Sequence, residues 1–189
     1  MHITFVRHGE TVENANGIVQ GHLPGTLTER GITQARAVAV RLSSESFDQA
    51  WSSDLARCAD TAEAIVSRHP GLRLRLASAL REYAHGEFEG RASSECDWTR
   101  TNSGLETRSP GGESALDVAG RLTAFLNALL IDHPNGRILV VTHGGPVRIM
   151  RAFCEDRRLG SLWEEPPIEN AGVLRCELAE PLLTSDLRW

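Results

Sequence analysis

The sequence predicts an α/β protein, a three-layer α/β/α sandwich around a mixed, mainly parallel sheet. Short apolar runs typical of buried strands alternate along the chain with longer segments whose apolar residues recur at helical spacing. The length of 189 residues suits one domain with one sizeable core, and hydrophobic residues make up an ordinary 41% of it. We therefore expect residues 1–189 to form a single domain.

Strands are expected where apolar, β-prone residues run into a glycine or a polar turn. The run over residues 137–142 is typical of a buried parallel strand, and strict alternation over 72–76 indicates a half-buried strand near an edge. The last two expected strands would form a hairpin across residues 179–181. In chain order, strands are expected over residues 3–6, 47–51, 72–76, 137–142, 171–178 and 182–189.

Helices are expected where apolar residues return every three or four positions. Thr28 is suited to be the N-cap of the first helix. The second and third stop at Pro70 and Pro134, because proline cannot continue a helix and a glycine follows each within two residues. In chain order, helices are expected over residues 28–42, 55–66, 114–131 and 146–154.

The charged residues exclude several kinds of chemistry. All 20 basic residues are arginine, because the sequence contains no lysine, and this excludes a phosphate-loop lysine, a Schiff-base lysine and the kinase strand lysine. The net charge of −5 argues against a general nucleic-acid binder. Any phosphate bound here must therefore be held by arginine, histidine or backbone amides.

Cysteine usage and the start of the chain bear on the compartment. Cys58, Cys96, Cys154 and Cys176 lie far apart and form no Cys-x-x-Cys pair, which favours reduced structural thiols over disulfides or a zinc site. The first residues lack a basic region followed by a long apolar stretch. We therefore expect a cytoplasmic location and no membrane partner.

Arg7 and His8 stand where the first expected strand ends, and ligands gather at the carboxyl ends of strands in an open α/β sheet. The arginine offers a permanent charge and a planar fork of donors suited to phosphate oxygens. A neutral histidine offers a ring nitrogen that can attack phosphorus. Gly9 lets the backbone approach a ligand closely. This pair therefore indicates chemistry on a bound anion.

Two later segments place similar groups at the start of a helix that follows a strand. Arg57 lies in the first turn of the helix over 55–66, and His143 follows the buried strand at a glycine turn. A helix amino terminus attracts anions. On their own, these would be interpreted as a solvated arginine and a structural histidine.

The segment Arg7–Thr11 resembles the signature of the histidine phosphatase superfamily, the phosphoglycerate mutase-like proteins. Four further segments follow in the family's order over most of residues 1–178. The resemblance implies that Arg57 is the second phosphate-binding arginine. It also implies that His143 is the second histidine of the site and that Gly144 offers its backbone amide.

The same resemblance implies that Glu82 protonates the leaving group, by its place two residues after Leu80 in the segment 80–90. A general acid must be protonated at working pH, so we expect partial burial of this side chain. Glu87 and Glu89 remain alternatives. So does a plain loop carboxylate paired with a local arginine such as Arg81.

Two polar stretches are expected to surround the site. In the family, the glycine-rich loop over 12–25 lines the phosphate pocket, so Asn14, Gln20 and Gly21 are candidate substrate contacts. Residues 83–112 are expected to form a cap that sets substrate choice, with Trp98 as an anchor. Three arginines scattered through this cap could hold a second anionic group of the substrate or simply be solvated: Arg91, Arg100 and Arg108.

The resemblance implies a metal-independent phosphatase that hydrolyses small phosphate monoesters through a phosphohistidine on His8, with no cofactor. Its partner would be a small phosphorylated metabolite, and the chain would be a monomer or a homodimer. A cofactor-dependent mutase and a non-catalytic binding module remain alternatives. A metal held by His8 and His143 is disfavoured, because the flanking arginines repel cations.

Overall fold

The computed structural model describes residues 1–99 and 103–189 of the chain. Its sheet has the strand order β3-β2-β4-β1-β5. Neighbouring strands are parallel, except that β5 runs antiparallel to β1. The strands are β1 (His2–Arg7), β2 (Gln49–Ser52), β3 (Leu74–Leu76), β4 (Arg137–Thr142) and β5 (Val173–Glu177). The predicted mixed, mainly parallel sheet is therefore confirmed.

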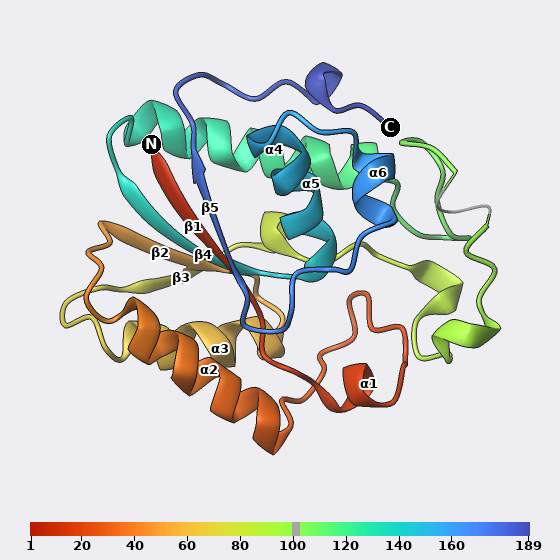
Figure 1. Cartoon of the computed structure of the whole chain (residues 1–189), viewed down its shortest axis with the longest axis horizontal. Coiled ribbons are helices and arrows are strands. Elements are labelled where there is room, and N and C mark those ends of the chain that lie inside the picture. Colours follow the sequence, from red (N-terminus) through yellow and green to blue (C-terminus); the bar gives the residue numbers. More distant parts are fainter. Residues whose placement is uncertain (100–102) are drawn as a thin grey trace.

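Helices cover both faces of this sheet, which confirms the three-layer sandwich (Figure 1). The helices are α1 (Val12–Ala15), α2 (Glu29–Leu42), α3 (Ala56–Val66), α4 (Ala115–Asp132), α5 (Gly144–Cys154) and α6 (Leu159–Trp163). α2 and α3 lie on one face, and α4 and α5 lie on the other. Within the described ranges, no helix combines the length and apolar character needed to cross a membrane.

Each face of the sheet has its own apolar core, and β1 contributes to both. Successive side chains of a strand point to opposite faces. Phe5 packs in the core with Leu122 and Ile149, whereas the adjacent Val6 packs with Leu42 and Ile65 on the opposite face. Burying each of these side chains contributes about 1.5–3 kcal/mol. β1 is thereby fixed in the centre of the protein, and its carboxyl end is held in place.

The helix caps follow the sequence. Thr28 Oγ1 accepts a hydrogen bond from the amide of Gly31 at 2.9 Å, as expected of an N-cap. Ser114 and Asp117 form a capping box at the start of α4. The helix predicted to begin at Pro146 begins two residues earlier, at Gly144.

The predicted carboxyl-terminal hairpin is wrong. Residues 182–189 hold only the short 3-10 turn Thr184–Asp186 instead of a strand. The side-chain amide of Asn127 on α4 both donates to the carbonyl of Leu182, at 2.9 Å, and accepts from its N–H, at 2.8 Å. The start of the segment is thus held by α4, whereas the carbonyl of Arg188 near its end accepts from the amide of Leu159.

The prediction of four reduced cysteines is also wrong. Cys154 and Cys176 form a disulfide with a Cα–Cα distance of 5.7 Å, whereas Cys58 and Cys96 are free. The end of α5 packs against β5, and spacing along the sequence does not show this proximity. The cytoplasmic location stays a prediction, and disulfides are uncommon in cytosolic proteins.

Candidate active site

Four of the five predicted catalytic residues line one cavity of about 260 Å3: Arg7, His8, Arg57 and Glu82. Arg7 is the last residue of β1, His8 follows it directly, and Arg57 comes from the first turn of α3. Glu82 follows a 3-10 turn that ends at Leu80. The carboxyl ends of β1, β2 and β4 meet at the same edge of the sheet, and distant segments of the chain therefore converge there.

His8 presents one ring nitrogen for nucleophilic attack. Its Nδ1 lies 2.7 Å from the carbonyl oxygen of Gly9. A carbonyl oxygen can only accept, so Nδ1 carries the proton and Nε2 of the neutral ring keeps its lone pair. The amide of Gly9 donates to Thr61 Oγ1 at 3.1 Å, which fixes the backbone beside the ring.

Burial and two guanidinium groups keep His8 neutral. Burial makes the largest contribution and lowers the pKa of His8 well below 6.5. Arg57 and then Arg7 lower the pKa further, because they oppose a third positive charge nearby.

The buried, positively charged environment of His8 predicts that its ring titrates at unusually low pH. The midpoint of His8, followed by NMR of its ring, should lie well below 6.5. Of the two arginines, Arg57 repels a positive charge on His8 more strongly. Arg57→Met removes this repulsion, so protonation of His8 becomes more favourable and its midpoint should move to higher pH. The control Arg36→Met, at an exposed position on α2, should leave it in place. A wild-type midpoint at or above 6.5 would contradict this electrostatic account.

Arg57 is 1% exposed and holds the loop between α1 and α2. Its Nη1 donates to the carbonyl of Leu23 at 2.5 Å, and its Nη2 donates to the carbonyl of Gly21 at 2.8 Å. Arg7 is anchored in a similar way, because its Nη1 donates to the carbonyl of Ile168 at 2.6 Å. Backbone carbonyls thus hold both guanidinium groups without neutralising their charge.

The Nε atoms of Arg7 and Arg57 are buried, and neither has a hydrogen-bond partner within the described residues. Leaving a buried donor unpaired costs about 1–3 kcal/mol, and more on a charged group. Both side chains line the cavity of His8, so a bound anion can accept from them there. The arrangement places two cationic donors beside a neutral histidine, and an anion would fit between them.

His143 is fully buried and packs edge-to-face against His8, with 5.2 Å between the ring centroids. Its Nε2 lies 2.8 Å from Ser53 Oγ, and the thiol of Cys58 lies beside the ring. Burial and then Arg57 lower the pKa of His143 well below 6.5, so the ring is neutral. Direct contact with a phosphoryl group would require the ring to exchange Ser53 for the anion.

Glu82 is half-buried, as expected. Its carboxylate accepts a hydrogen bond from the backbone amide of Tyr83 at 3.0 Å and another from the amide of Gly145 at 3.2 Å. A Cβ on Gly145 would lie 2.3 Å from Glu82 Oε1, so only glycine fits there. Arg81 pairs with Asp54 instead, at 2.6 Å, which leaves the Glu82 carboxylate facing the cavity.

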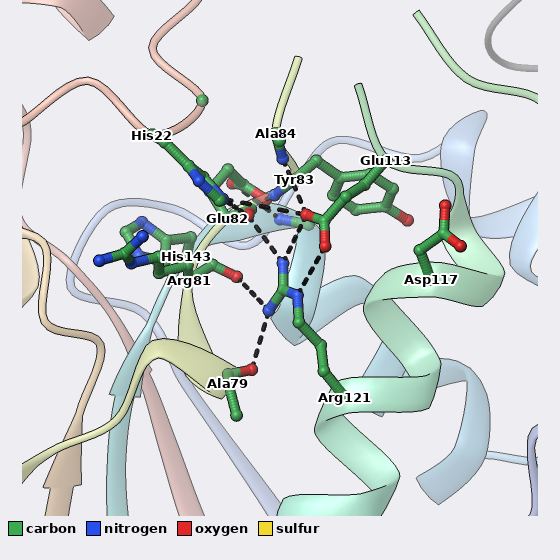
Figure 2. Close-up of polar contacts among 12 residues, drawn as sticks. His22, Ala79, Arg81, Glu82, Tyr83, Ala84, Glu113, Asp117, Arg121 and His143 are labelled. Carbon is green, nitrogen blue, oxygen red and sulfur yellow. Dashed lines mark hydrogen bonds and ion pairs between the residues drawn. The ribbon is translucent and has the colours of Figure 1, made fainter. Parts of the chain in front are cut away.

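Arg121 and Glu113 hold the backbone that carries Glu82, and the sequence did not predict either residue (Figure 2). Arg121 points from α4 and donates to the carbonyls of Ala79, Arg81 and Glu82 at 2.7–2.8 Å. Its other donors bind the Glu113 carboxylate at 2.9 and 3.0 Å. All five N–H groups of the guanidinium thus donate hydrogen bonds, and three of these bonds tie the backbone of residues 79–82 to α4.

Of the predicted substrate contacts, Asn14, Gln20 and Gly21 line the His8 cavity. Gln20 Oε1 is buried without a hydrogen-bond partner among the described residues, and is free to accept from a ligand. Gly144 instead lines a neighbouring cavity together with Glu82. Its position is close to Arg7, because a Cβ there would lie 3.4 Å from Arg7 Nε.

The alternative acids are placed differently from Glu82. Glu89 Oε1 accepts from the amides of His22 and His85 at 3.1 and 2.9 Å, which is a structural role. Glu87 is exposed and lines neither this cavity nor the neighbouring one.

Neither described arginine of the predicted cap, Arg91 or Arg108, lines the His8 cavity. Arg91 is exposed and donates to the carbonyl of Glu95 at 3.3 Å. Arg108 pairs with Asp117 at 3.1 Å. Arg100 lies outside the described residues.

A neutral histidine flanked by two buried arginines, with a carboxyl group in the same cavity, defines a site for phosphoryl transfer. The profile of the histidine phosphatase superfamily (branch 1) matches residues 3–184. The chain belongs to this family, and it is an enzyme of the phosphatase class.

Relatives with curated names include both mutases and phosphatases. "Phosphoglycerate mutase-like protein 4" of Arabidopsis thaliana is 37% identical over 77% of this chain and 67% of its own length. "Metal-independent phosphoserine phosphatase" of the same plant is 37% identical over 77% of this chain and 65% of its own length.

Solved structures are also similar to this chain. A mycobacterial glucosyl-3-phosphoglycerate phosphatase is 28% identical, with a TM-score of 0.82, over 92% of this chain and 91% of that chain. The alpha-ribazole phosphatase from Shigella flexneri is 27% identical, with a TM-score of 0.80, over 93% of this chain and 89% of that chain.

Proposed function

We propose that this chain is a metal-independent phosphatase that hydrolyses small phosphate monoesters through a phosphohistidine on His8. The observation that carries the proposal is a pair of buried Nε donors, on Arg7 and Arg57, that have no partner among the described residues. Both arginines line the cavity of His8, whose Nε2 keeps its lone pair. A phosphoryl group accepts from both cations while the histidine attacks. A solved neighbour, the glucosyl-3-phosphoglycerate phosphatase, was obtained with inorganic phosphate, which agrees with this chemistry.

In the first step, the lone pair of His8 Nε2 forms a bond to phosphorus and the ester P–O bond breaks. The protonated carboxyl of Glu82 gives its proton to the departing oxygen, so a neutral alcohol leaves. Arg7 and Arg57 stabilise the charge that develops on the phosphoryl oxygens, as metal ions do in other phosphoryl-transfer enzymes. The product of this step is a phosphohistidine and a carboxylate.

In the second step, the Glu82 carboxylate takes a proton from a water molecule as that water attacks phosphorus. The N–P bond breaks, and inorganic phosphate and the neutral imidazole are released. The carboxyl is protonated again and ready for the next turnover. The ring of His143 packs against the ring of His8. If His143 Nε2 gave up its contact with Ser53 Oγ, it would be able to bind a phosphoryl oxygen.

A mutase of the same family is the second candidate, because several relatives carry the name phosphoglycerate mutase. A mutase passes the phosphoryl group to a second alcohol in place of water. Assay with a phosphoglycerate, alone and with a bisphosphoglycerate, separates the two: inorganic phosphate as the product supports the phosphatase, and an isomeric phosphoglycerate supports the mutase.

A metal-chelation assay tests the proposal directly. Hydrolysis of 4-nitrophenyl phosphate should proceed in the wild type and be unchanged, within about twofold, by EDTA, because arginines supply the positive charge. A loss of turnover that added Mg²⁺ or Zn²⁺ restores would contradict metal independence. An inert wild type across a panel of metabolite phosphates would favour a binding module.

A further inference from the structure

A second cavity, of about 380 Å3, opens beside the first on the other side of Glu82. Glu82, His85, Ser93 and Trp98 line both cavities. An ester whose phosphoryl group lies at His8 has its ester oxygen near Glu82, which must protonate it. The alcohol of such a substrate is therefore directed into the second cavity.

Aromatic rings form much of the wall of this cavity: Tyr83, Trp98, Trp163 and Trp189. Tyr83 is buried, and its ring lies edge-on to Trp163 with 6.4 Å between the centroids. Flat apolar walls of this kind pack against rings, and the volume lies within the range of typical small-molecule sites. The cavity thus suits an alcohol that carries a ring, larger than a three-carbon acid.

The hydroxyl of Tyr83 is buried and has no hydrogen-bond partner among the described residues. Burial raises the pKa of this phenol, so the group stays neutral and can donate. A buried phenol in the wall of a cavity is costly to leave unpaired. It indicates that the occupant carries a polar group as well as apolar surface.

Arg148 adds a positive charge to the same wall. Its guanidinium lies 4.2 Å over the ring of Trp163, and its Nη2 donates to the carbonyl of Glu165 at 3.1 Å. Within the described residues it forms no ion pair, whereas Arg108, also in the wall, is neutralised by Asp117. A half-buried cation without a carboxylate partner favours an anion in the cavity.

We propose that the second cavity is the leaving-group subsite, and that it takes an alcohol bearing both a flat ring and an anionic group, with Arg148 binding the anion. The inference rests on the proposed phosphatase function and names the substrate class for it. The predicted second-anion site is thereby assigned to α5 and not to the cap arginines Arg91 and Arg108.

The test compares two substrates that differ by one charge. Phenyl phosphate and carboxyphenyl phosphate, the latter as its 3- and 4-isomers, are assayed in the wild type and in Arg148→Gln. For each protein we take kcat/KM for carboxyphenyl phosphate divided by kcat/KM for phenyl phosphate. The quotient of the wild-type ratio over the Arg148→Gln ratio cancels the intrinsic difference in reactivity between the two esters. For at least one isomer we expect this quotient to be about tenfold, typical of a lost charge-assisted hydrogen bond.

Three further measurements sharpen the test. Arg148→Lys keeps the charge and should retain part of the preference for the carboxylate. Arg175→Gln, at a position where Arg175 pairs with Glu45 and lines neither cavity, should leave the quotient at one. Trp163→Leu should lower the preference for phenyl phosphate over ethyl phosphate, because it removes the flat wall.

The possible outcomes distinguish failure of the proposed subsite from failure of the proposed phosphatase function. If Arg148→Gln leaves the quotient at one for both isomers while His8-dependent hydrolysis of phenyl phosphate persists, the subsite is overturned and the phosphatase function stands. If no ester is hydrolysed by the wild type, both proposals fall. A quotient near ten for either isomer, with phenyl phosphate still hydrolysed by Arg148→Gln, supports the subsite.

Discussion

His8→Gln should lower kcat for every phosphate monoester by at least about 10⁴-fold, which is of the order found when a catalytic nucleophile is removed. Glutamine is similar in size to histidine and uncharged, as the buried ring of His8 is. It lacks a ring nitrogen that can attack phosphorus. The fold should therefore survive while the chemistry is lost.

Rapid acid-free quenching of the wild type with substrate, followed by mass spectrometry, should find a phosphoryl group on His8. The His8→Gln variant should carry none. The control is His69→Gln, since His69 is a half-buried histidine beyond the end of α3, where its ring packs against Phe47. A phosphoryl group found on another residue, or turnover retained by His8→Gln, would show that a different nucleophile does the work.

The sheet and its helices were predictable because local pattern and tertiary environment agree. β4 is apolar along its length since it is buried on both faces, and its neighbour β1 is buried almost as completely. Caps such as Thr28 are local, because each bonds within its own first turn. The hairpin over 171–189 failed because a distant side chain, Asn127 on α4, binds both backbone groups of Leu182, where the second strand was expected to begin.

The site was predictable only where the chemistry requires a particular residue type. Arg7 and His8 stand next to each other in the chain, and the resemblance to a family supplied the distant Arg57. Arg121 left no such signal. Besides Glu113, its acceptors are three backbone carbonyls, which every residue has, so the spacing of side chains does not reveal which segment the guanidinium holds.

The second cavity could not be found from the sequence either. Its wall combines Tyr83 and Trp98 from the predicted cap with Arg148 from α5 and Trp189 from the end of the chain. The sequence directed attention to the arginines of the cap, because they lie close to the acid segment. The fold instead places Arg148 in the wall of the cavity that Glu82 also lines, since α5 starts directly after the carboxyl end of β4.

Glu82→Gln should slow the cleavage of esters with poor leaving groups by about 10²–10³-fold, within the range of general acid catalysis. It should slow 4-nitrophenyl phosphate only a few-fold, because 4-nitrophenolate leaves without a proton. The quantity to measure is kcat/KM, which reports the steps up to ester cleavage. Plotted as its logarithm against the pKa of the leaving alcohol, kcat/KM should fall more steeply in the variant than in the wild type.

The same variant should show a burst of 4-nitrophenol equal to the enzyme concentration. Without the carboxylate, no group takes the proton from the attacking water, so the phosphohistidine should accumulate after the first turnover. Glu87→Gln is the matched control, since Glu87 is exposed in the same segment and lines neither cavity. Equal losses for good and poor leaving groups would remove Glu82 from the acid role, and a selective loss in Glu87→Gln would transfer that role to Glu87.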